Sequence, residues 1–337
     1  MPSTPGEDPN VAESTALSAI HPDIIQTHIL TRLPGPALAS AAATCSQLHS
    51  LSSHDPLWVN ACHATWPSTL APRVRHVIDT FPNAARSFFA DSFSSSHSLS
   101  SNKTTFSSND PNRTPELISA VDLFHNESLL FSKVVETETV TGWFRCSPFR
   151  IDLVDPKHAV KTGVKYPVDE DTCRELEESL RLTWILVDAT GKRAVDVSSG
   201  KVVALEKHWL SGEVVVRFAT AAVAALCSVA VTWGTEMQIK EISFQMEDVD
   251  GVQMNGRDSL VILQSVLEGE RKWKKKKEEG GEGYRVFLKR KKERKEEKVR
   301  TEGRLDMLCV GLAVVTMVAS SLFLFWRWHH SLTLLDN

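Results

Sequence analysis

The sequence predicts an α+β chain with three parts: a small helical domain, a mostly β, sandwich-like domain, and a single C-terminal transmembrane helix. Three observations predict this organisation. Apolar residues recur at helical spacing over residues 17–63, β-branched and aromatic residues alternate over much of residues 117–268, and residues 307–326 form an uncharged apolar run. A length of 337 residues is sufficient for two domains and additional segments.

The helical domain is expected to follow a disordered lead of residues 1–16, which is polar and rich in proline. Pro22 suits the first turn of a helix, and Ile25, Ile29 and either Arg32 or Leu33 then follow at helical spacing. Pro34-Gly35-Pro36 ends this first helix, because proline disfavours a helical residue before it.

Two more short helices are predicted in the same domain. Alanine-rich residues 37–45 form the second, in which small side chains permit close packing. Asp55 is expected to be the N-cap of the third, with Pro56 behind it and Leu57 and Trp58 on the helix. Three short helices of this kind make a compact bundle, and the bland interpretation is that these residues are simply its core.

The order of these features resembles the F-box, the module that docks a ubiquitin-ligase substrate receptor onto the Skp adaptor and cullin. The family pattern has two leucine-proline pairs, an isoleucine-leucine pair, a valine-cysteine pair and a terminal leucine-tryptophan. Its matches here are Pro22, Ile29-Leu30, Leu33-Pro34, Cys45 and Leu57-Trp58. His21 departs from the usual leucine, and Leu48 stands near a common tryptophan position. The resemblance implies an adaptor-binding site made of Pro22, Ile24, Ile25, Ile29, Leu30, Leu33, Pro34, Leu38, Cys45, Leu57 and Trp58.

Composition restricts the cellular setting. The net charge of -4 and the pI near 6.3 conceal a crowding of Lys and Arg between Arg271 and Arg304. The six cysteines include no Cys-x-x-Cys, which argues against a disulfide framework or a zinc ribbon and suits a reducing compartment. Residues 1–19 lack the apolar core of a signal peptide, so we expect the chain to start in the cytosol.

Residues 64–116 are expected to hold a helical segment around Val74–Phe89 and a Ser/Asn-rich loop over Asp91–Thr114. A β-rich substrate-recognition domain is expected over residues 117–268. Its expected strands are Leu129–Val135, Gly142–Cys146, Arg150–Val154, Leu182–Asp188, Lys201–Leu205, Glu213–Phe218, Val229–Trp233 and Gln238–Met246. Residues 219–227 are compatible with a helix or a buried strand, and Asp258 is expected to cap a last helix.

Five further motifs stand out in the sequence: Ser87-Phe88-Phe89, the run from Gly142 to Arg150, Arg193-Ala194, His208-Trp209-Leu210 and the run from Asp258 to Gln264. On these motifs the chain resembles plant F-box proteins of the group that includes the cytokinin-induced F-box protein, some of which carry a carboxy-terminal membrane segment. The strand pattern is also similar, at the level of fold alone, to the phloem-lectin sandwich of other plant F-box proteins.

The carboxy-terminal region is expected to be a basic linker of residues 269–306, a transmembrane helix from Met307 to Trp326, and a short tail of residues 327–337. Twenty helical residues rise about 30 Å, the thickness of the hydrocarbon core of a bilayer. The basic linker is compatible with a solvated spacer, a nuclear-import patch or a lipid-headgroup anchor. The Lys and Arg residues before the span predict that the bulk of the chain is cytosolic, as in a tail-anchored protein of the endoplasmic reticulum or the nuclear envelope.

No catalytic motif, metal-ligand spacing or cofactor motif is found in the sequence. The resemblance to the F-box, together with this absence of catalytic motifs, implies a non-catalytic substrate receptor of an SCF-type ubiquitin ligase, with no cofactor. Its expected partners are the Skp adaptor and cullin, an unknown protein substrate and the lipid bilayer, but no nucleic acid. The alternative is a membrane-anchored scaffold or lectin-like ligand-binding protein with a degenerate F-box.

Overall fold

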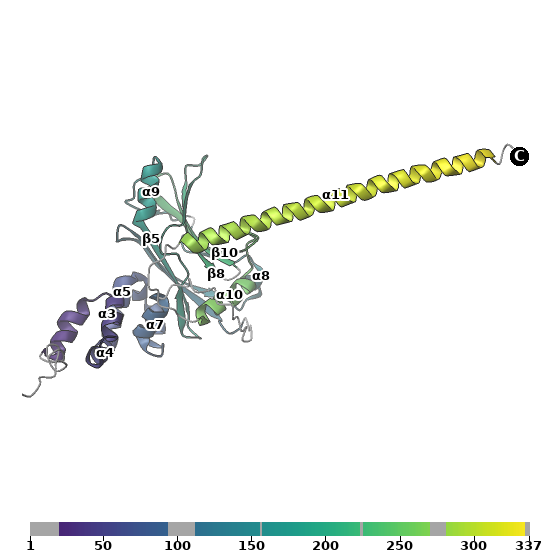
Figure 1. The fold of residues 1–337 in the computed structure, drawn as a ribbon. Helices are drawn as coiled ribbons and strands as arrows, with labels where there is room; N and C mark the ends of the chain where they lie inside the picture. Colours follow the sequence, from purple (N-terminus) through teal and green to yellow (C-terminus); the bar gives the residue numbers. More distant parts are fainter. Residues whose placement is uncertain (1–19, 94–111, 156, 223–224, 270–280, 334–337) are drawn as a thin grey trace, which may run out of the picture. The chain divides into compact units, whose positions relative to one another are not determined.

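The computed structural model describes residues 20–93, 112–155, 157–222, 225–269 and 281–333 (Figure 1). These residues divide into two compact units. The first runs to Asp248 and from Val252 to Tyr284, and the second comprises Val249–Gly251 and the residues from Arg285 onward. The predicted disordered lead, and most of the predicted Ser/Asn-rich loop, lie outside the described residues.

The first unit begins with short helical elements, most of which begin next to a proline. Proline is favoured there because its missing N–H would have no partner in the first turn. The elements are α2 (Pro22–Ile24), η1 (Ile25–Ile29), η2 (Leu30–Arg32), α3 (Gly35–Ala42), α4 (Ser46–Ser52), α5 (Asp55–Thr65), η3 (Pro67–Leu70), α6 (Pro72–Asp79) and α7 (Ala84–Phe93).

Two details of this region differ from the sequence prediction. Helix α4 was not predicted, because its residues are mostly polar and give no apolar period. Asp55 is not the N-cap of α5: it lies within the first turn, after His54. Its Oδ1 instead accepts a hydrogen bond of 3.1 Å from the backbone N–H of Ala85, near the start of α7. Asp55 therefore provides the hydrogen-bond acceptor for a backbone N–H in the first turn of α7, thirty residues away in the sequence.

The β-rich region forms two antiparallel sheets. The four-stranded sheet has the order β2-β1-β5-β6, and the six-stranded sheet has the order β3-β10-β9-β8-β7 with β4 paired to β10. The strands are β1 (Glu116–His125), β2 (Ser128–Glu138), β3 (Arg150–Asp152), β4 (Val160–Lys161), β5 (Leu180–Asp188), β6 (Arg193–Asp196), β7 (Ala204–Lys207), β8 (Val214–Ala222), β9 (Ala225–Trp233) and β10 (Gln238–Asp248). Residues 219–227, left open between helix and strand, thus belong to β8 and β9 wherever they are described.

The four-stranded sheet is covered on both faces. One face shares a core with the six-stranded sheet, in which Trp184 of β5 packs at 5.3 Å from Phe244 of β10. The other face belongs to the core of the amino-terminal helices. Its residues are Ile118, Ala120, Ile185, Val187 and Ala194. Because both faces are buried, β1 and much of β5 lack the buried-exposed alternation of a half-exposed strand.

Three further helices accompany the sheets: α8 (Gly142–Cys146), α9 (Glu170–Ser179) and α10 (Gly256–Glu268). The prediction of a strand at Gly142–Cys146 was wrong. Thr141 caps a short helix there by accepting from the N–H of Phe144, and α10 packs closely against it. A side chain at Gly256 would meet the carbonyl oxygen of Phe144 at 2.1 Å, so this contact requires glycine.

The N-caps of α9 and α10 were not predicted from the sequence. Asn255, not the predicted Asp258, caps α10, and its side-chain oxygen accepts from the N–H of Asp258 at 2.8 Å. Helix α9 was not predicted because Leu176 is its one buried residue. The sequence feature that could have predicted α9 is the capping box of Asp169 and Thr172, in which each side chain accepts a hydrogen bond from the other residue's backbone N–H.

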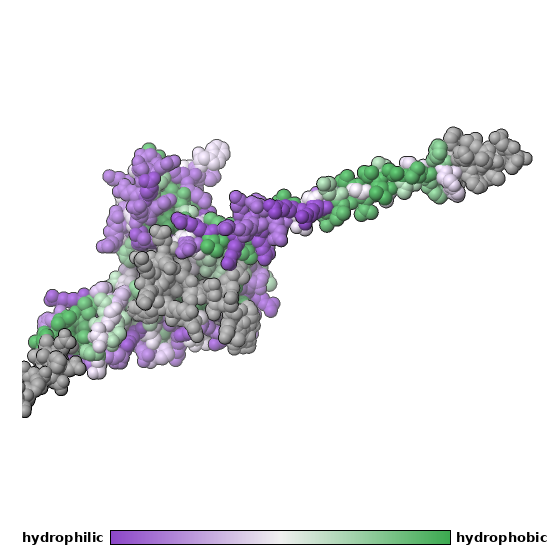
Figure 2. All heavy atoms as spheres, viewed as in Figure 1, coloured by the Kyte–Doolittle hydropathy of each residue, from purple (hydrophilic) through white to green (hydrophobic). Residues whose placement is uncertain are grey.

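One continuous helix, α11 (Gly281–Thr333), supplies most of the second unit through its residues from Arg285 onward. Figure 2 shows its hydrophilic first part giving way to an apolar part. This helix is long and apolar enough to cross a membrane, and none of its most apolar stretch is buried. The residues of the predicted span, 307–326, are helical throughout, and residues 281–306 of the predicted linker are helical as well.

Candidate functional site

The first helical segment, residues 22–32, has two apolar faces. Its middle is a π-helical turn, in which the N–H of Leu30 bonds the carbonyl oxygen of Ile25. A π turn brings residues five apart onto one face. Ile25 and Leu30 accordingly face inward and are 1% and 2% exposed, whereas Ile24 and Ile29 face outward and are 49% and 45% exposed.

The inward face closes the core of the helical region. Ile25, Leu30, Leu38, Leu57 and Trp58 are all buried in one cluster. The indole N–H of Trp58 donates to the carbonyl oxygen of Ser52 at 2.7 Å, so its polar atom is satisfied inside the core.

Phe89 of α7 completes this core from outside the predicted domain of residues 17–63. Its ring lies 5.5 Å from the ring of Trp58 and 5.1 Å from that of Trp66. Phe89 also approaches α3 so closely that a side chain at Gly35 would meet its ring at 2.1 Å. Gly35 is therefore needed for this approach, and the helices after residue 63 are part of the same structure.

The outward face gathers the rest of the predicted site. Pro22, Ile24, Ile29 and Pro34 are exposed, and Leu33 is half-buried beside them in the sequence. Exposed apolar side chains gathered on one short segment are typical of a surface that binds another protein. Cys45 is exposed too, on the loop between α3 and α4. Sequence reasoning selected both sets of residues without separating them, because the separation depends on the π turn.

The two departures from the family pattern have clear local roles. His21 is the N-cap of the first helix, and its Nδ1 accepts from the N–H of Asp23 at 3.3 Å. A leucine there would lack this acceptor. Leu48 is half-buried and packs against the helical core. A leucine therefore contributes to packing at a position near which the family often has tryptophan.

Polar contacts fix the helical region to the four-stranded sheet. The carboxylate of Asp122 on β1 is fully buried and accepts from the backbone N–H and the hydroxyl of Ser68 at 2.9 and 2.6 Å. The hydroxyl of Ser132 on β2 donates to the same carboxylate at 2.7 Å. Burial raises the pKa of Asp122, while these hydrogen bonds oppose the rise. One carboxylate thus joins η3, β1 and β2.

A second joint lies at the surface. Arg73 of α6 contacts Glu116 of β1 at 2.6 Å and Glu136 of β2 at 3.5 Å. A hydrogen bond with Glu116 is the main cause of a raised pKa at Glu136. The helical region and the sheet are therefore connected by polar contacts as well as by a shared apolar core.

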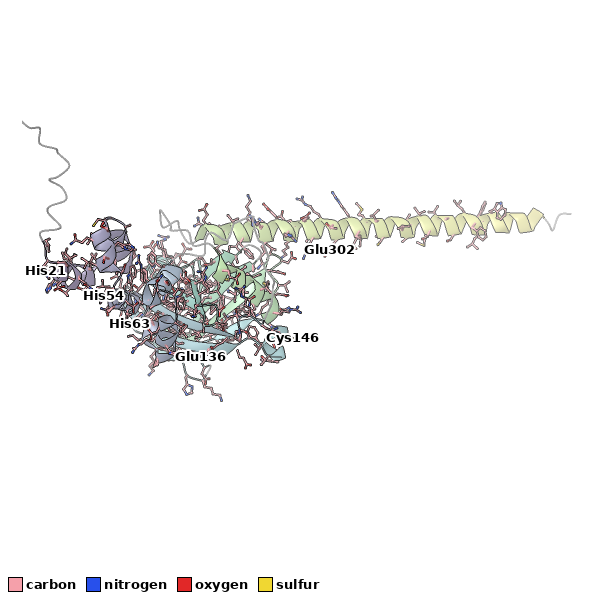
Figure 3. All side chains as sticks on the ribbon, turned by 90° about the horizontal axis from the view of Figure 1, so that it is seen from below. His21, His54, His63, Glu136, Cys146 and Glu302 are labelled. Atoms are coloured by element: carbon pink, nitrogen blue, oxygen red, sulfur yellow. The ribbon has the colours of Figure 1, made fainter. Side chains whose placement is uncertain are left out.

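Three histidines of the helical region lie apart from one another, and two of the described cysteines are buried. Figure 3 shows His21, His54 and His63 spread along the helical region. Within the described ranges, no three His, Cys, Asp or Glu side chains are placed to hold a metal ion. Burial raises the pKa of the Cys62 and Cys227 thiols to about 12, so both remain protonated packing groups.

A cavity of 260 Å³ between β5, β6 and α10 is lined by charged groups that already have partners. Arg113 contacts Glu268 at 2.5 Å, and Arg193 lies 3.8 Å from Asp91. Asp188 accepts from the hydroxyl of Thr114 and from the backbone of its own turn. These contacts make the cavity part of the packing of α10 against the sheet.

Comparison with known proteins identifies the helical region. A family model described as F-box-like matches residues 22–64. The probable F-box protein At2g36090 of Arabidopsis thaliana is 42% identical over 324 residues, which cover 95% of this chain and 96% of that protein. The chain belongs to the plant F-box protein family.

Two further relatives from Arabidopsis thaliana support the same assignment. The F-box protein At2g27310 is 42% identical over 89% of this chain and 94% of its own length. The F-box protein At3g44326 is 38% identical over 96% of this chain and 94% of its own length. No solved structure matches this F-box protein.

Membership of the family gives the helical region a general role. F-box proteins generally act as substrate-receptor subunits of SCF ubiquitin ligases, and the F-box domain implies binding to a Skp-type adaptor. The predicted fold is also confirmed: F-box helices precede a mostly β antiparallel domain and a long apolar carboxy-terminal helix.

Proposed function

We propose that this F-box protein is a non-catalytic substrate receptor of an SCF-type ubiquitin ligase and that its apolar carboxy-terminal helix tethers it to a membrane. It recruits a target protein to the Skp adaptor and cullin, and the transferase chemistry belongs to other subunits. The observation that carries the proposal is the outward apolar face of residues 22–34, in a domain whose inward face is already filled by its own core.

Only some of the residues assigned to the site from the sequence are proposed to contact the adaptor directly. The exposed residues Pro22, Ile24, Ile29 and Pro34 supply the contact surface, since burial of exposed apolar area drives protein association. Leu33 is half-buried, packs partly against the helical core and lies at the border of this surface. Ile25, Leu30, Leu38, Leu57 and Trp58 support that surface from within. Cys45 is exposed on the loop between α3 and α4 and is a peripheral member of the proposed site.

The connection between the F-box and the sheet supports the role of a receptor. A ligase must hold its target at a fixed place relative to the catalytic subunits, because a positioned encounter replaces a diffusional one. Asp122, Ser68 and the shared apolar core join the F-box region to the four-stranded sheet. The β-rich domain therefore serves as a rigid platform for the target, and it corresponds in motifs to the cytokinin-induced group.

The membrane tether rests on α11 alone. Residues 307–326 are uncharged, and the preceding residues from Arg285 to Arg304 are rich in Lys and Arg. Positive residues beside a span tend to remain on the cytosolic side, and this supports the proposal that the F-box is cytosolic, like its proposed partners. The membrane proposed is that of the endoplasmic reticulum or the nuclear envelope.

The adaptor proposal is tested by co-purification of the Skp adaptor and cullin with tagged full-length protein. Ile24→Ala together with Ile29→Ala is expected to reduce adaptor recovery at least tenfold, as for central contacts of an interface. The second variant, Leu33→Ala with Pro34→Ala, is expected to act in the same direction. Leu70→Ala is the matched control, because Leu70 is equally exposed but lies outside the F-box face.

Two outcomes of this co-purification oppose the proposal. If the Ile24 and Ile29 variant keeps its melting temperature and its full adaptor recovery, the outward face is not the adaptor site. If the wild-type protein recovers neither adaptor nor cullin, the alternative of a membrane scaffold or ligand-binding protein with a degenerate F-box is favoured.

Topology is tested with two glycosylation sequences, Asn112-Arg113-Thr114 and Asn126-Glu127-Ser128. Asn126, Glu127 and Ser128 are all exposed, whereas in the first sequence Asn112 is exposed but Thr114 is buried, so the second sequence is the main reporter. In the cytosol neither is reached by the glycosylating enzyme, so no glycosidase-sensitive mass shift is expected. A variant with an added secretory signal and without residues 307–337 is the positive control. A shift in the native protein would place the F-box on the wrong side of the membrane for its adaptor.

A further inference from the structure

The β7–β8 hairpin carries the most exposed apolar side chain among the large apolar residues that the structure describes. Trp209 is 88% exposed and Leu210, next to it, is 74% exposed. Both lie in the loop that joins Lys207 to Val214, which are paired residues of β7 and β8. Leaving two large neighbouring apolar groups in water is unfavourable unless a partner covers them.

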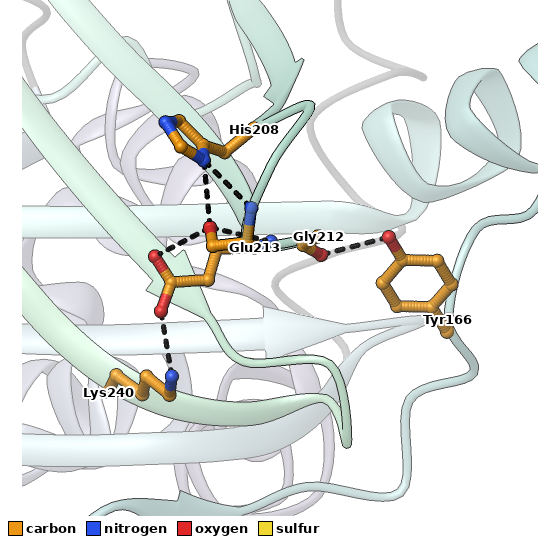
Figure 4. A network of polar contacts seen from close by, with 6 residues as sticks. Tyr166, His208, Gly212, Glu213 and Lys240 are labelled. Atoms are coloured by element: carbon orange, nitrogen blue, oxygen red, sulfur yellow. Dashed lines mark hydrogen bonds and ion pairs between the residues drawn. The ribbon is translucent and has the colours of Figure 1, made fainter.

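A polar network holds this loop in one conformation (Figure 4). Nδ1 of His208 accepts from the backbone N–H of Ser211 at 3.0 Å, and the Ser211 hydroxyl lies 2.9 Å from the same nitrogen. That hydroxyl also donates to Glu213, whose other carboxylate oxygen accepts from Lys240 on β10 at 2.7 Å. The loop therefore presents its apolar residues without the ordering cost of a flexible segment.

A neighbouring segment adds a third apolar side chain. The Tyr166 hydroxyl donates to the carbonyl oxygen of Gly212 at 2.8 Å, and Nζ of Lys207 donates to the carbonyl oxygen of Val168 at 3.0 Å. Val168 is 79% exposed. We call Val168, Trp209 and Leu210 the hairpin-tip surface.

The hairpin-tip surface adjoins a strongly acidic helix. Helix α9, which follows Val168 and lies against β7, carries with its N-cap six carboxylates and a single basic residue, Arg174. Arg174 lies 3.5 Å from Asp171, and Lys207 is engaged with Val168 and the Tyr166 ring. The six carboxylates are those of Asp169, Glu170, Asp171, Glu175, Glu177 and Glu178.

The stability of α9 explains only part of this acidity. Asp169, Glu170 and Asp171 lie at the amino-terminal end, where the helix dipole favours negative charge. Glu177 and Glu178 lie in the last turn, where the dipole disfavours them and where α9 has no basic residue. Arg181, which follows α9, donates to the carbonyl oxygen of Glu178 at 2.6 Å and offsets part of this cost. The helix itself nevertheless gains nothing from the carboxylates of Glu177 and Glu178, which leaves them available to a basic partner.

We propose that the hairpin-tip surface is the docking site for a protein segment that combines an aromatic or aliphatic anchor with Lys or Arg residues. The anchor covers Trp209 and Leu210, and the basic residues pair with the carboxylates of α9. Identification of this segment as part of the ligase target rests on the proposed function. The same carboxylates oppose insertion of the tip into an anionic bilayer, since such a surface repels negative charge.

The test is selection of a phage-displayed random peptide library on the full chain in zwitterionic nanodiscs, with empty nanodiscs for counterselection. Enriched peptides are expected to combine Lys or Arg with an aromatic or aliphatic residue. Trp209→Ala with Leu210→Ser is expected to weaken their binding at least tenfold, and Glu177→Lys with Glu178→Lys is expected to weaken it by a smaller, salt-dependent factor.

Trp143→Ala is the matched control. Trp143 is 83% exposed, but α8 packs on α10 near the Ala225 end of the six-stranded sheet, whereas the hairpin tip lies at the Trp233 end. This variant is expected to bind the peptides like the wild type. Equal melting temperatures of the variants establish that a loss of binding is not a loss of folding.

Three results overturn the proposal: no enriched peptide, acidic enriched peptides, or peptides that bind the Trp209 and Leu210 variant as well as the wild type. Trp209-dependent quenching of fluorescence by brominated lipids in the nanodisc would also overturn it, because it would assign the tip to the bilayer. Adaptor co-purification with the same variants separates the two proposals. If peptides bind at the tip but no adaptor is recovered, the docking site stands and the ligase role fails.

Discussion

The two sheets of the β-rich domain are covered in different ways. The four-stranded sheet lies between the F-box helices and the second sheet, so residues such as Ile118 and Ile185 are buried on the side that would otherwise face solvent. The six-stranded sheet keeps the alternation of a half-exposed sheet in β8 and β9 and ends in the exposed hairpin tip. The comparison teaches that one sheet provides attachment to the F-box, whereas the other presents an exposed hairpin tip.

The largest expected difference between the sheets is in tolerance to truncation. Ile185→Ala on β5 is expected to destabilise the fold by about 2 to 5 kcal/mol, because it leaves a cavity between the sheet and the helices. Val215→Ala on β8, where the side chain is half-buried, is expected to cost less than about 1 kcal/mol. Chemical denaturation of both variants measures the difference. Equal losses would mean that the helices do not seal the four-stranded sheet.

The next effect concerns the polar joint to the F-box. Asp122→Ala leaves the Ser68 N–H without its acceptor in the interior and is expected to cost about 1 to 3 kcal/mol. Asp122→Asn keeps an acceptor oxygen and is expected to cost less. Limited proteolysis near residues 66–71 should detect release of the helices from the sheet in the alanine variant. Wild-type protection in that variant would contradict the role of this carboxylate.

The third prediction uses Asp196 at the edge of the four-stranded sheet. Its Oδ1 accepts from the N–H of Trp184 and from both the N–H and the hydroxyl of Ser198. Burial raises the pKa of Asp196 to about 6, from an ordinary value of 3.8. The folded chain therefore binds this proton more tightly than the unfolded chain does, and the stability it contributes is full below pH 3.8 and lost as the pH rises through 6.

Asp196→Asn should remove this pH dependence, since one oxygen accepts all three hydrogen bonds. Relative to the wild type, the variant is expected to gain about 1 to 2 kcal/mol between pH 4 and pH 8. This is less than the full shift of the pKa implies, because solvent reaches part of the residue. Parallel denaturation curves across that range provide the measurement. If the stability of the variant relative to the wild type instead increased as the pH was lowered, the sign would be wrong and the assignment would be rejected.

The smallest effect is expected on the six-stranded sheet, at the ion pair of Glu213 and Lys240. The hydrogen bond from Lys240 lowers the pKa of Glu213, so the pair contributes to stability above the ordinary carboxyl range and loses it as the pH falls. Lys240→Ala is expected to cost less than about 1 kcal/mol, since both groups are reached by solvent. Thermal denaturation at neutral pH and moderate salt measures this cost. A loss of stability of more than about 1 kcal/mol would show that the ion pair contributes to the stability of the fold.

Local patterns determined much of the organisation. Prolines and apolar spacing predicted the helices of residues 22–65, although α4 was missed because polar residues give no period. Alternation predicted β8, β9 and β10, which are half-exposed strands, and the uncharged run at 307–326 predicted a continuous helix. These features could be predicted because each is determined by residues that are close together in the sequence.

Tertiary structure decided which residues of those patterns face a partner. The π turn separates Ile24 and Ile29 from Ile25 and Leu30, although all four were assigned from the sequence to one adaptor-binding site. The packing of α10 and the cap of Thr141 make a helix of a segment rich in strand-forming residues. Ser68 and Asp122, 54 residues apart, meet only because two layers pack together. Periodicity records which residues can be buried, whereas contacts between distant segments determine which of them are.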